Sequence, residues 1–109
     1  MAFDEGLAER IREHVEGHTD VVEKRMFGGL AFVYRGNMAV GVHKDGLMVR
    51  IAPEDHETAL AMPDVRQFDM TGRPMKGWIV VVGEALGDDA VLAEWVERGM
   101  THAGSLPPK

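Results

Sequence analysis

The sequence of 109 residues contains no cysteine. The chain therefore has no disulfide, no thiolate metal site and no thiol nucleophile, a composition that fits a reducing compartment. It also has no apolar run close to the roughly 20 residues that a membrane-spanning helix needs. Its first residues, MAFDEGLAER, are acidic where a secretory signal is basic and then apolar. We therefore expect a cytoplasmic protein that is not bound to a membrane.

The net charge of −6 is unevenly spread along the chain. Residues 1–23 carry seven acidic residues against two arginines, whereas residues 24–50 carry five basic residues and only one acid, Asp45. The overall negative charge opposes direct binding to nucleic acid, although the basic segment could hold a phosphate locally. We expect no direct nucleic-acid partner.

Three segments have the pattern of helices with one apolar face. Near the N-terminus, apolar residues recur at a spacing of four: Phe3, Leu7, Ile11 and Val15. This spacing predicts a helix over about residues 4–17. Pro53, followed by two acidic residues, predicts the start of a short helix that ends near residue 62. Asp88 predicts the cap of a third helix.

The middle of the chain has the pattern of β-hairpins. Two dipeptides that favour tight turns, Gly36-Asn37 and Asp45-Gly46, divide it. We expect five strands, at about residues 24–35, 38–44, 47–52, 68–71 and 77–82. The predicted fold class is α+β: a two-layer sandwich with about three helices on one face of a five-stranded, mainly antiparallel sheet. It forms one domain over residues 1–104, followed by a disordered tail over residues 105–109.

Counting outward from two-residue turns predicts the register of both hairpins. Val33 then faces Val40, and Val42 faces Val49, on an aliphatic side that the helices cover. The opposite side of the sheet then carries Phe32, Tyr34, His43, Met48 and Arg50. Exposed apolar residues of this kind usually mark an interface, so we expect a homodimer or another protein partner to bind at this face or at an edge strand.

The run RMFGG at residues 25–29 carries the most specific family signal. Together with LAFVYRGNMAVGV, LMVRI, FDMTGRPMKGWIVV and a closing helix that contains a tryptophan, it resembles the TfoX N-terminal domain family over residues 23–103. The resemblance implies a bacterial protein with an α+β fold related to type III secretion chaperones. It also implies kinship with the regulator of natural competence, and it implies no catalytic residue.

Competence regulators of this family carry a second, helical domain after the N-terminal one, whereas this chain ends in THAGSLPPK. We therefore expect a stand-alone version of the N-terminal domain. A domain without its usual companion need not share the task of the two-domain protein, which weakens the transfer of the competence role.

Four basic residues and two glycines suggest a second kind of site. Arg25, Arg50, Arg73 and Lys76 could converge on an anion, with Gly28 and Gly29 letting backbone amides approach it. The glycines match no phosphate-loop motif. The alternative is that the cations are surface residues paired with the acidic helices and that the glycines form a strand bulge. We expect the glycines to bend the first strand, with Arg25 and Phe27 directed toward residues 72–78. The candidate binding residues are therefore Arg25, Phe27, Gly28, Gly29, Phe32, Tyr34, Met48, Arg50, Arg73 and Lys76.

Signals for metal binding or catalysis are weak. His14 and His18 share a helical spacing but lack the glutamate of a zinc-protease motif. Ser105 belongs to no recognisable triad order. We expect no metal, no cofactor and no enzyme activity. The favoured hypothesis is a noncatalytic regulatory or adaptor domain that acts through protein contacts, linked to bacterial transcriptional or competence-type regulation; the alternative is a small-molecule or anion-binding domain.

Overall fold

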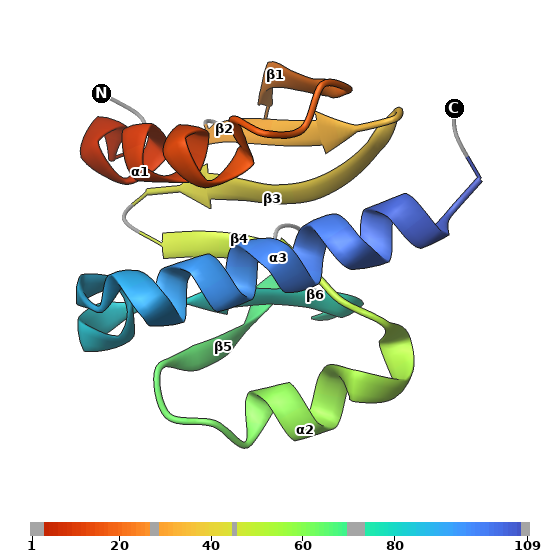
Figure 1. Ribbon diagram of the computed structural model, residues 1–109. Helices are drawn as coiled ribbons and strands as arrows, with labels where there is room; N and C mark the ends of the chain where they lie inside the picture. The colour runs from red at the N-terminus through yellow and green to blue at the C-terminus, as the bar shows by residue number, and fades with distance from the viewer. Residues whose placement is uncertain (1–3, 27–28, 45, 70–73, 108–109) are drawn as a thin grey trace.

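The computed structural model describes residues 4–26, 29–44, 46–69 and 74–107 (Figure 1). The α-helices are α1 (Glu5–Val15), α2 (His56–Leu60) and α3 (Asp89–Ser105), and two short 3₁₀ helices are η1 (Pro53–Asp55) and η2 (Gly83–Gly87). The strands are β1 (Val21–Met26), β2 (Gly29–Tyr34), β3 (Asn37–His43), β4 (Gly46–Arg50), β5 (Val65–Asp69) and β6 (Pro74–Val81).

The described strands form one antiparallel sheet of six strands in the order β1-β2-β3-β4-β6-β5. Helices α1 and α3 lie side by side across one face of it (Figure 1). The predicted α+β class is confirmed. The predicted number of five strands is wrong, because residues 24–35 do not form one long strand: β1 and β2 are separate and pair with each other.

Both long helices have an aspartate at the N-cap position, directly before the first helical residue. The Asp4 carboxylate accepts a hydrogen bond from the Leu7 amide at 3.0 Å, and the Asp88 carboxylate accepts from the Ala90 amide at 2.9 Å. The predicted cap at Asp88 is thereby confirmed. The apolar stripe of α1 is buried as expected, but the helix ends at Val15, two residues before the predicted glycine.

The register of the first hairpin differs from the prediction by one residue. Val40 pairs with Phe32 and not with Val33, and the register shifts after Phe32. The turn consists of Arg35 and Gly36, both with positive φ (53° and 85°), as a two-residue hairpin turn requires. A shift of one residue exchanges the two faces of a strand.

Asn37 explains why the turn lies one residue earlier than predicted. The residue is the first of β3, only 2% exposed, and its side-chain amide donates a hydrogen bond to the Pro107 carbonyl at 3.0 Å. A buried side-chain amide needs such a partner, and a place at the tip of an exposed turn would remove it. The contact joins the first hairpin to the segment that follows α3.

The second hairpin is shifted by two residues. Val40 pairs with Val49, and Val42 pairs with Leu47 and not with Val49. The turn begins at Lys44, whose φ is 56°, and Gly46 already belongs to β4. Because side chains alternate with a period of two, this shift leaves every predicted face unchanged. Val40, Val42 and Val49 are fully buried in the core that the helices cover.

Helix α3 packs closely on the centre of the sheet. It contacts β3 and β4 and carries the buried residues Leu92, Val96 and Met100. Its Gly99 lies directly over β3: a Cβ atom added there would meet the Ala39 carbonyl oxygen at 2.6 Å. A glycine at this position allows the two backbones to approach to a distance that a larger residue would prevent.

Candidate functional site

The sheet face that turns away from α1 and α3 is here called the rear face. One row of paired residues crosses all six strands on this face: Lys24, Ala31, Gly41, Met48, Val80 and Arg66. Beside this row, Arg50 pairs with Trp78. The Arg50 guanidinium carbon lies 5.4 Å from the centre of the Trp78 ring, a cation–π distance.

Two of the predicted interface residues are not on the rear face. Phe32 is fully buried beneath the helices, because the one-residue shift of the first hairpin turns its side chain toward the core. Tyr34 packs on the same core and lies under Gly104 of α3. The prediction that these two rings share an exposed face with Met48 is therefore wrong. Met48 does lie on the rear face, but it is only 1% exposed.

The predicted group of four basic residues does not assemble. Arg25 belongs to β1 and pairs with Leu30, a core residue, so it lies on the helix side of the sheet. Arg50 belongs to β4, three strands away, on the opposite face. Lys76 is exposed on β6, a further strand away, so the predicted meeting of Arg25 with Lys76 is wrong. The reason is that β1 is an edge strand and pairs only with β2.

Two residues of the RMFGG segment, Phe27 and Gly28, lie outside the described residues. Arg73 lies outside them as well. Gly29 is described and begins β2. A Cβ atom at this position would overlap the Val42 carbonyl oxygen, so a side chain would push β2 away from β3. The close approach of β3 is therefore the reason that this position needs a glycine.

The rear face is hollowed at one end by a pocket of about 290 Å³, between the turn that follows β3 and the strand β5. Its lining includes His43, Lys44, Gly46, Arg66, Phe68 and Val80. The rings of His43 and Phe68 meet edge to face with their centres 5.6 Å apart, and Trp78 lies 6.5 Å beyond Phe68. We call this hollow the basic pocket. Sequence reasoning placed His43 on this face but missed Arg66, which only the pairing of β5 with β6 brings there.

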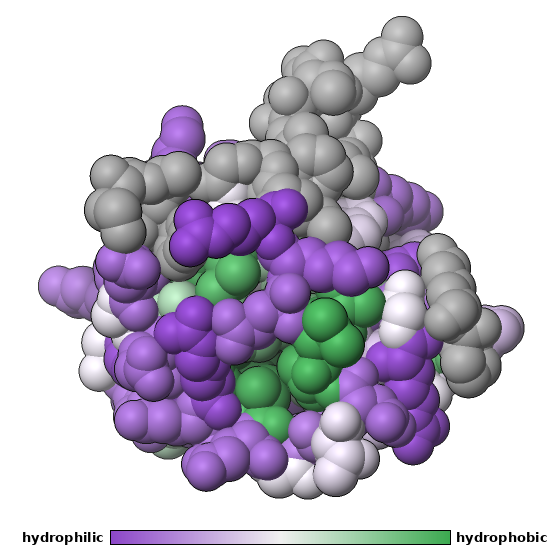
Figure 2. All heavy atoms as spheres, turned by 90° about the horizontal axis from the view of Figure 1, so that it is seen from above, coloured by the Kyte–Doolittle hydropathy of each residue, from purple (hydrophilic) through white to green (hydrophobic). Residues whose placement is uncertain are grey.

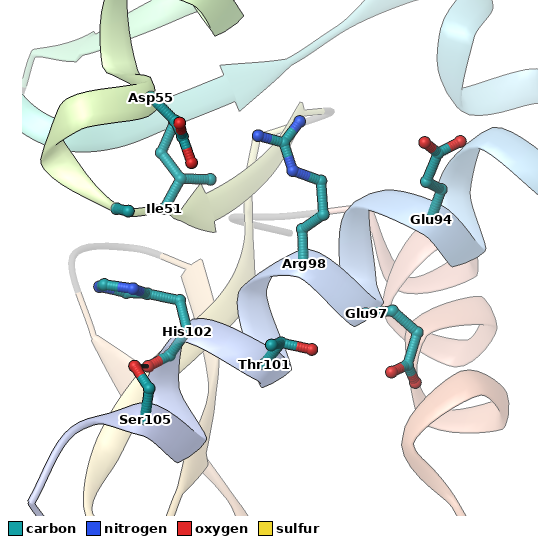
Figure 3. A pocket seen from close by; sticks show the side chains of 9 residues that line it. Ile51, Asp55, Glu94, Glu97, Arg98, Thr101, His102 and Ser105 are labelled. Atoms are coloured by element: carbon teal, nitrogen blue, oxygen red, sulfur yellow. Dashed lines mark hydrogen bonds between the residues drawn. The ribbon is translucent and has the colours of Figure 1, made fainter.

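A larger, open groove of about 470 Å³ runs along α3 beside η1 (Figure 3). Arg98 points across the groove, and its guanidinium carbon lies 4.6 Å from the centre of the buried Trp95 ring. Ser105 donates its hydroxyl to the His102 carbonyl at 2.6 Å. The hydroxyl proton therefore points to a backbone oxygen and not to an imidazole.

The two histidines that share a helical spacing contact different acids on α3. His14 Nε2 lies 3.4 Å from Asp89 Oδ1, and His18 Nε2 lies 3.6 Å from Glu97 Oε1. The described residues contain no group of three or more side chains of the kinds that hold a metal ion. These two contacts join α1 and the segment that follows it to α3.

The edge strand β1 is tied to α1 by one ion pair. Arg12 donates to both carboxylate oxygens of Glu23 at 2.8 Å, in a two-pronged contact. The hydrogen bonds from Arg12 lower the pKa of Glu23 below its ordinary value, against a smaller opposing effect of burial. The pair holds the helix side of β1 against α1. The outer edge of β1 has no neighbouring strand in the described sheet.

Sequence reasoning also missed a buried histidine that contacts the backbone of β6. His56 of α2 is 5% exposed, and its Nδ1 accepts a hydrogen bond from the Gly77 amide at 3.0 Å. Gly77 has a φ of 88°, so this contact holds β6 at an irregular point one residue before Trp78. No local sequence pattern predicts the pairing, because the two residues are brought together by the sheet.

Among the described residues, no helix is long and apolar enough to span a membrane. A comparison with protein-family models matches residues 13–103 to the TfoX N-terminal domain. Neither the curated proteins nor the solved structures contain a match to the chain.

Proposed function

Because the chain belongs to the TfoX N-terminal domain family, we propose that it is a noncatalytic regulatory or adaptor domain of the bacterial cytoplasm that acts by binding proteins. Its task is linked to transcriptional or competence-type regulation. Its first partner is a second copy of itself. The observation that supports this proposal is that β1 pairs on one side only in the described sheet, so its outer edge is open to another strand.

An outermost strand presents a row of backbone donors and acceptors to any strand that approaches. On β1, Val22 is 55% exposed. Two large hydrophobic residues are exposed in the described part of the chain, and Val22 is the more exposed of them. Figure 2 views the molecule from above Figure 1, on the β1 side, and shows a small apolar area enclosed by hydrophilic side chains. An exposed edge beside apolar surface favours addition of another strand.

The sequence of β1 is suited to pairing with its own copy. In a two-fold antiparallel pair centred on Lys24, Glu23 of each strand faces Arg25 of the other, and Val22 faces Met26. The symmetry therefore repeats one charge-complementary pair and one apolar pair on both sides of the axis. The two Lys24 side chains meet at the centre on the rear face, where their length lets the ammonium groups separate.

The test is the oligomeric state of matched charge variants. Val22→Glu introduces a carboxylate at the proposed interface, and Met62→Glu introduces the same change at the other strongly exposed apolar side chain, which is 44% exposed near α2. Light scattering after size exclusion should give a dimer for the wild type and for Met62→Glu, and a monomer for Val22→Glu. A monomeric wild type at millimolar concentration, or a dimer that survives Val22→Glu, would refute the β1 interface.

A further inference from the structure

The basic pocket has the composition of a site for an anion. Two of its lining residues, Lys44 and Arg66, carry full positive charges, and its lining includes no aspartate or glutamate among the described residues. The chain as a whole has a net charge of −6. A positive hollow on an acidic protein concentrates field lines and attracts small anions.

Among the described residues, the cations of the pocket differ from three other arginines, which have carboxylate partners. Arg10, Arg12 and Arg35 each pair with a carboxylate. Within the described part of the chain, Lys44 and Arg66 make no ion pair and no hydrogen bond through their side chains. Both residues are exposed and available to a ligand.

His43 supplies a third donor. Its Nδ1 is buried and has no hydrogen-bond partner in the described structure. A buried N–H without an acceptor is rarer in proteins than an unused acceptor, so in the neutral ring the proton belongs on Nε2. The edge-to-face contact with Phe68 fixes the plane of the ring.

The rest of the lining is apolar and depends on a glycine. Phe68, Val80 and Val82 form the walls. A Cβ atom at Gly46 would lie 2.6 Å from Cγ1 of Val80 and 3.3 Å from Cγ1 of Val82, so any other residue there would crowd these walls. An inorganic anion would leave such walls unused, whereas a ligand with an apolar body would bury part of them.

We propose that the basic pocket binds a small organic carboxylate, with Arg66, Lys44 and His43 holding the carboxylate and Phe68 and Val80 contacting its apolar body. The guanidinium of Arg66 can donate two parallel hydrogen bonds to the two carboxylate oxygens. This inference goes beyond the proposed function and does not depend on the β1 dimer, because β1 and β5 form opposite edges of the sheet.

The test is a titration of the ¹⁵N-labelled protein with sodium benzoate at constant ionic strength. Amide shifts of Lys44, Gly46, Arg66 and Phe68 should move together and saturate. Arg66→Gln should weaken binding by at least about tenfold, since it removes a charge-assisted pair of hydrogen bonds. Arg66→Lys should recover part of that loss, because it keeps the charge without the planar fork.

The matched control is Arg35→Gln, which removes one exposed positive charge from the turn before β3, at the end of that strand far from the pocket. It should change the affinity by less than about twofold, because charges separated by more than a Debye length are largely screened. Shifts that do not saturate, or equal effects of Arg35→Gln and Arg66→Gln, would overturn the site. Inorganic phosphate that binds as tightly as benzoate would overturn the assignment of an organic ligand.

Discussion

Replacement of Gly99 by alanine tests whether the close packing of α3 on the sheet depends on the absence of a side chain at this position. The added Cβ atom would meet the Ala39 carbonyl oxygen and Cγ1 of Val40, both at 2.6 Å. Ordinary contact begins at 3.4 Å, so the shortfall is about 0.8 Å. The oxygen belongs to the backbone of β3, and the next residue, Val40, pairs with Phe32 of β2 and Val49 of β4, so the oxygen cannot move far without the sheet. The helix must therefore shift outward.

The size of the effect follows from two opposing contributions. Alanine in place of glycine inside a helix stabilises by roughly 0.5–1 kcal/mol. Forcing an extra methyl group into a packed core costs about 1–3 kcal/mol. At Gly99 the obstacle is rigid, so we take the upper part of that range and expect a net loss of about 2 kcal/mol. For a domain of this size, such a loss lowers the melting temperature by about 8 °C.

The matched control is Gly104→Ala in the same helix. Its added Cβ atom would meet only the ring of Tyr34, at 3.0 Å, and a half-buried ring can tilt away from the contact. We expect this variant to be between unchanged and about 1 kcal/mol more stable than the wild type. Urea unfolding followed by circular dichroism measures both variants. A Gly99→Ala protein as stable as the wild type would show that this glycine does not set the position of α3.

Two further expectations concern single contacts. Arg12→Gln should lower the free energy of unfolding at pH 7 by less than about 1 kcal/mol, because both partners of the Arg12–Glu23 pair are more than one-third exposed. Since the pKa of Glu23 is lowered from 4.5 in the folded state, the difference from the wild type should shrink as the pH falls below 4.5, and a constant difference would contradict the pair. His56→Leu should cost about 1–3 kcal/mol in urea unfolding, because the buried Gly77 amide loses its acceptor. An unchanged midpoint would show that the acceptor is dispensable.

The elements that sequence reasoning located correctly are those whose causes are local. The stripe of α1 needs only its own spacing of four, and the start of α3 needs only the carboxylate of Asp88 and the amides that follow it. In both cases the interacting groups lie within one helical turn. No distant contact competes with them, so the local pattern decides the outcome.

The first hairpin shows how a distant contact changes a local choice. The residues Arg35, Gly36 and Asn37 offer two possible two-residue turns, and local chemistry favours the pair that ends in asparagine. The structure uses the other pair, in which Arg35 adopts a positive φ. The compensating contact is the hydrogen bond from Asn37 to Pro107, seventy residues away in the chain. That partner cannot be found from the turn itself.

The same one-residue shift changes what the rear face can bind. With the predicted register, β2 would present Phe32 and Tyr34 there; with the observed one it presents Ala31 and Val33, which are small. The aromatic rings of the rear face come instead from Phe68 and Trp78, on strands that lie beyond β4. Binding chemistry is therefore expected at the end of the sheet that holds β5 and β6, where the basic pocket lies, and pairing at the opposite edge, where β1 has no neighbour in the described sheet. Since these two surfaces lie on opposite edges of one rigid sheet, a ligand in the pocket and a second copy on β1 can be accommodated at the same time.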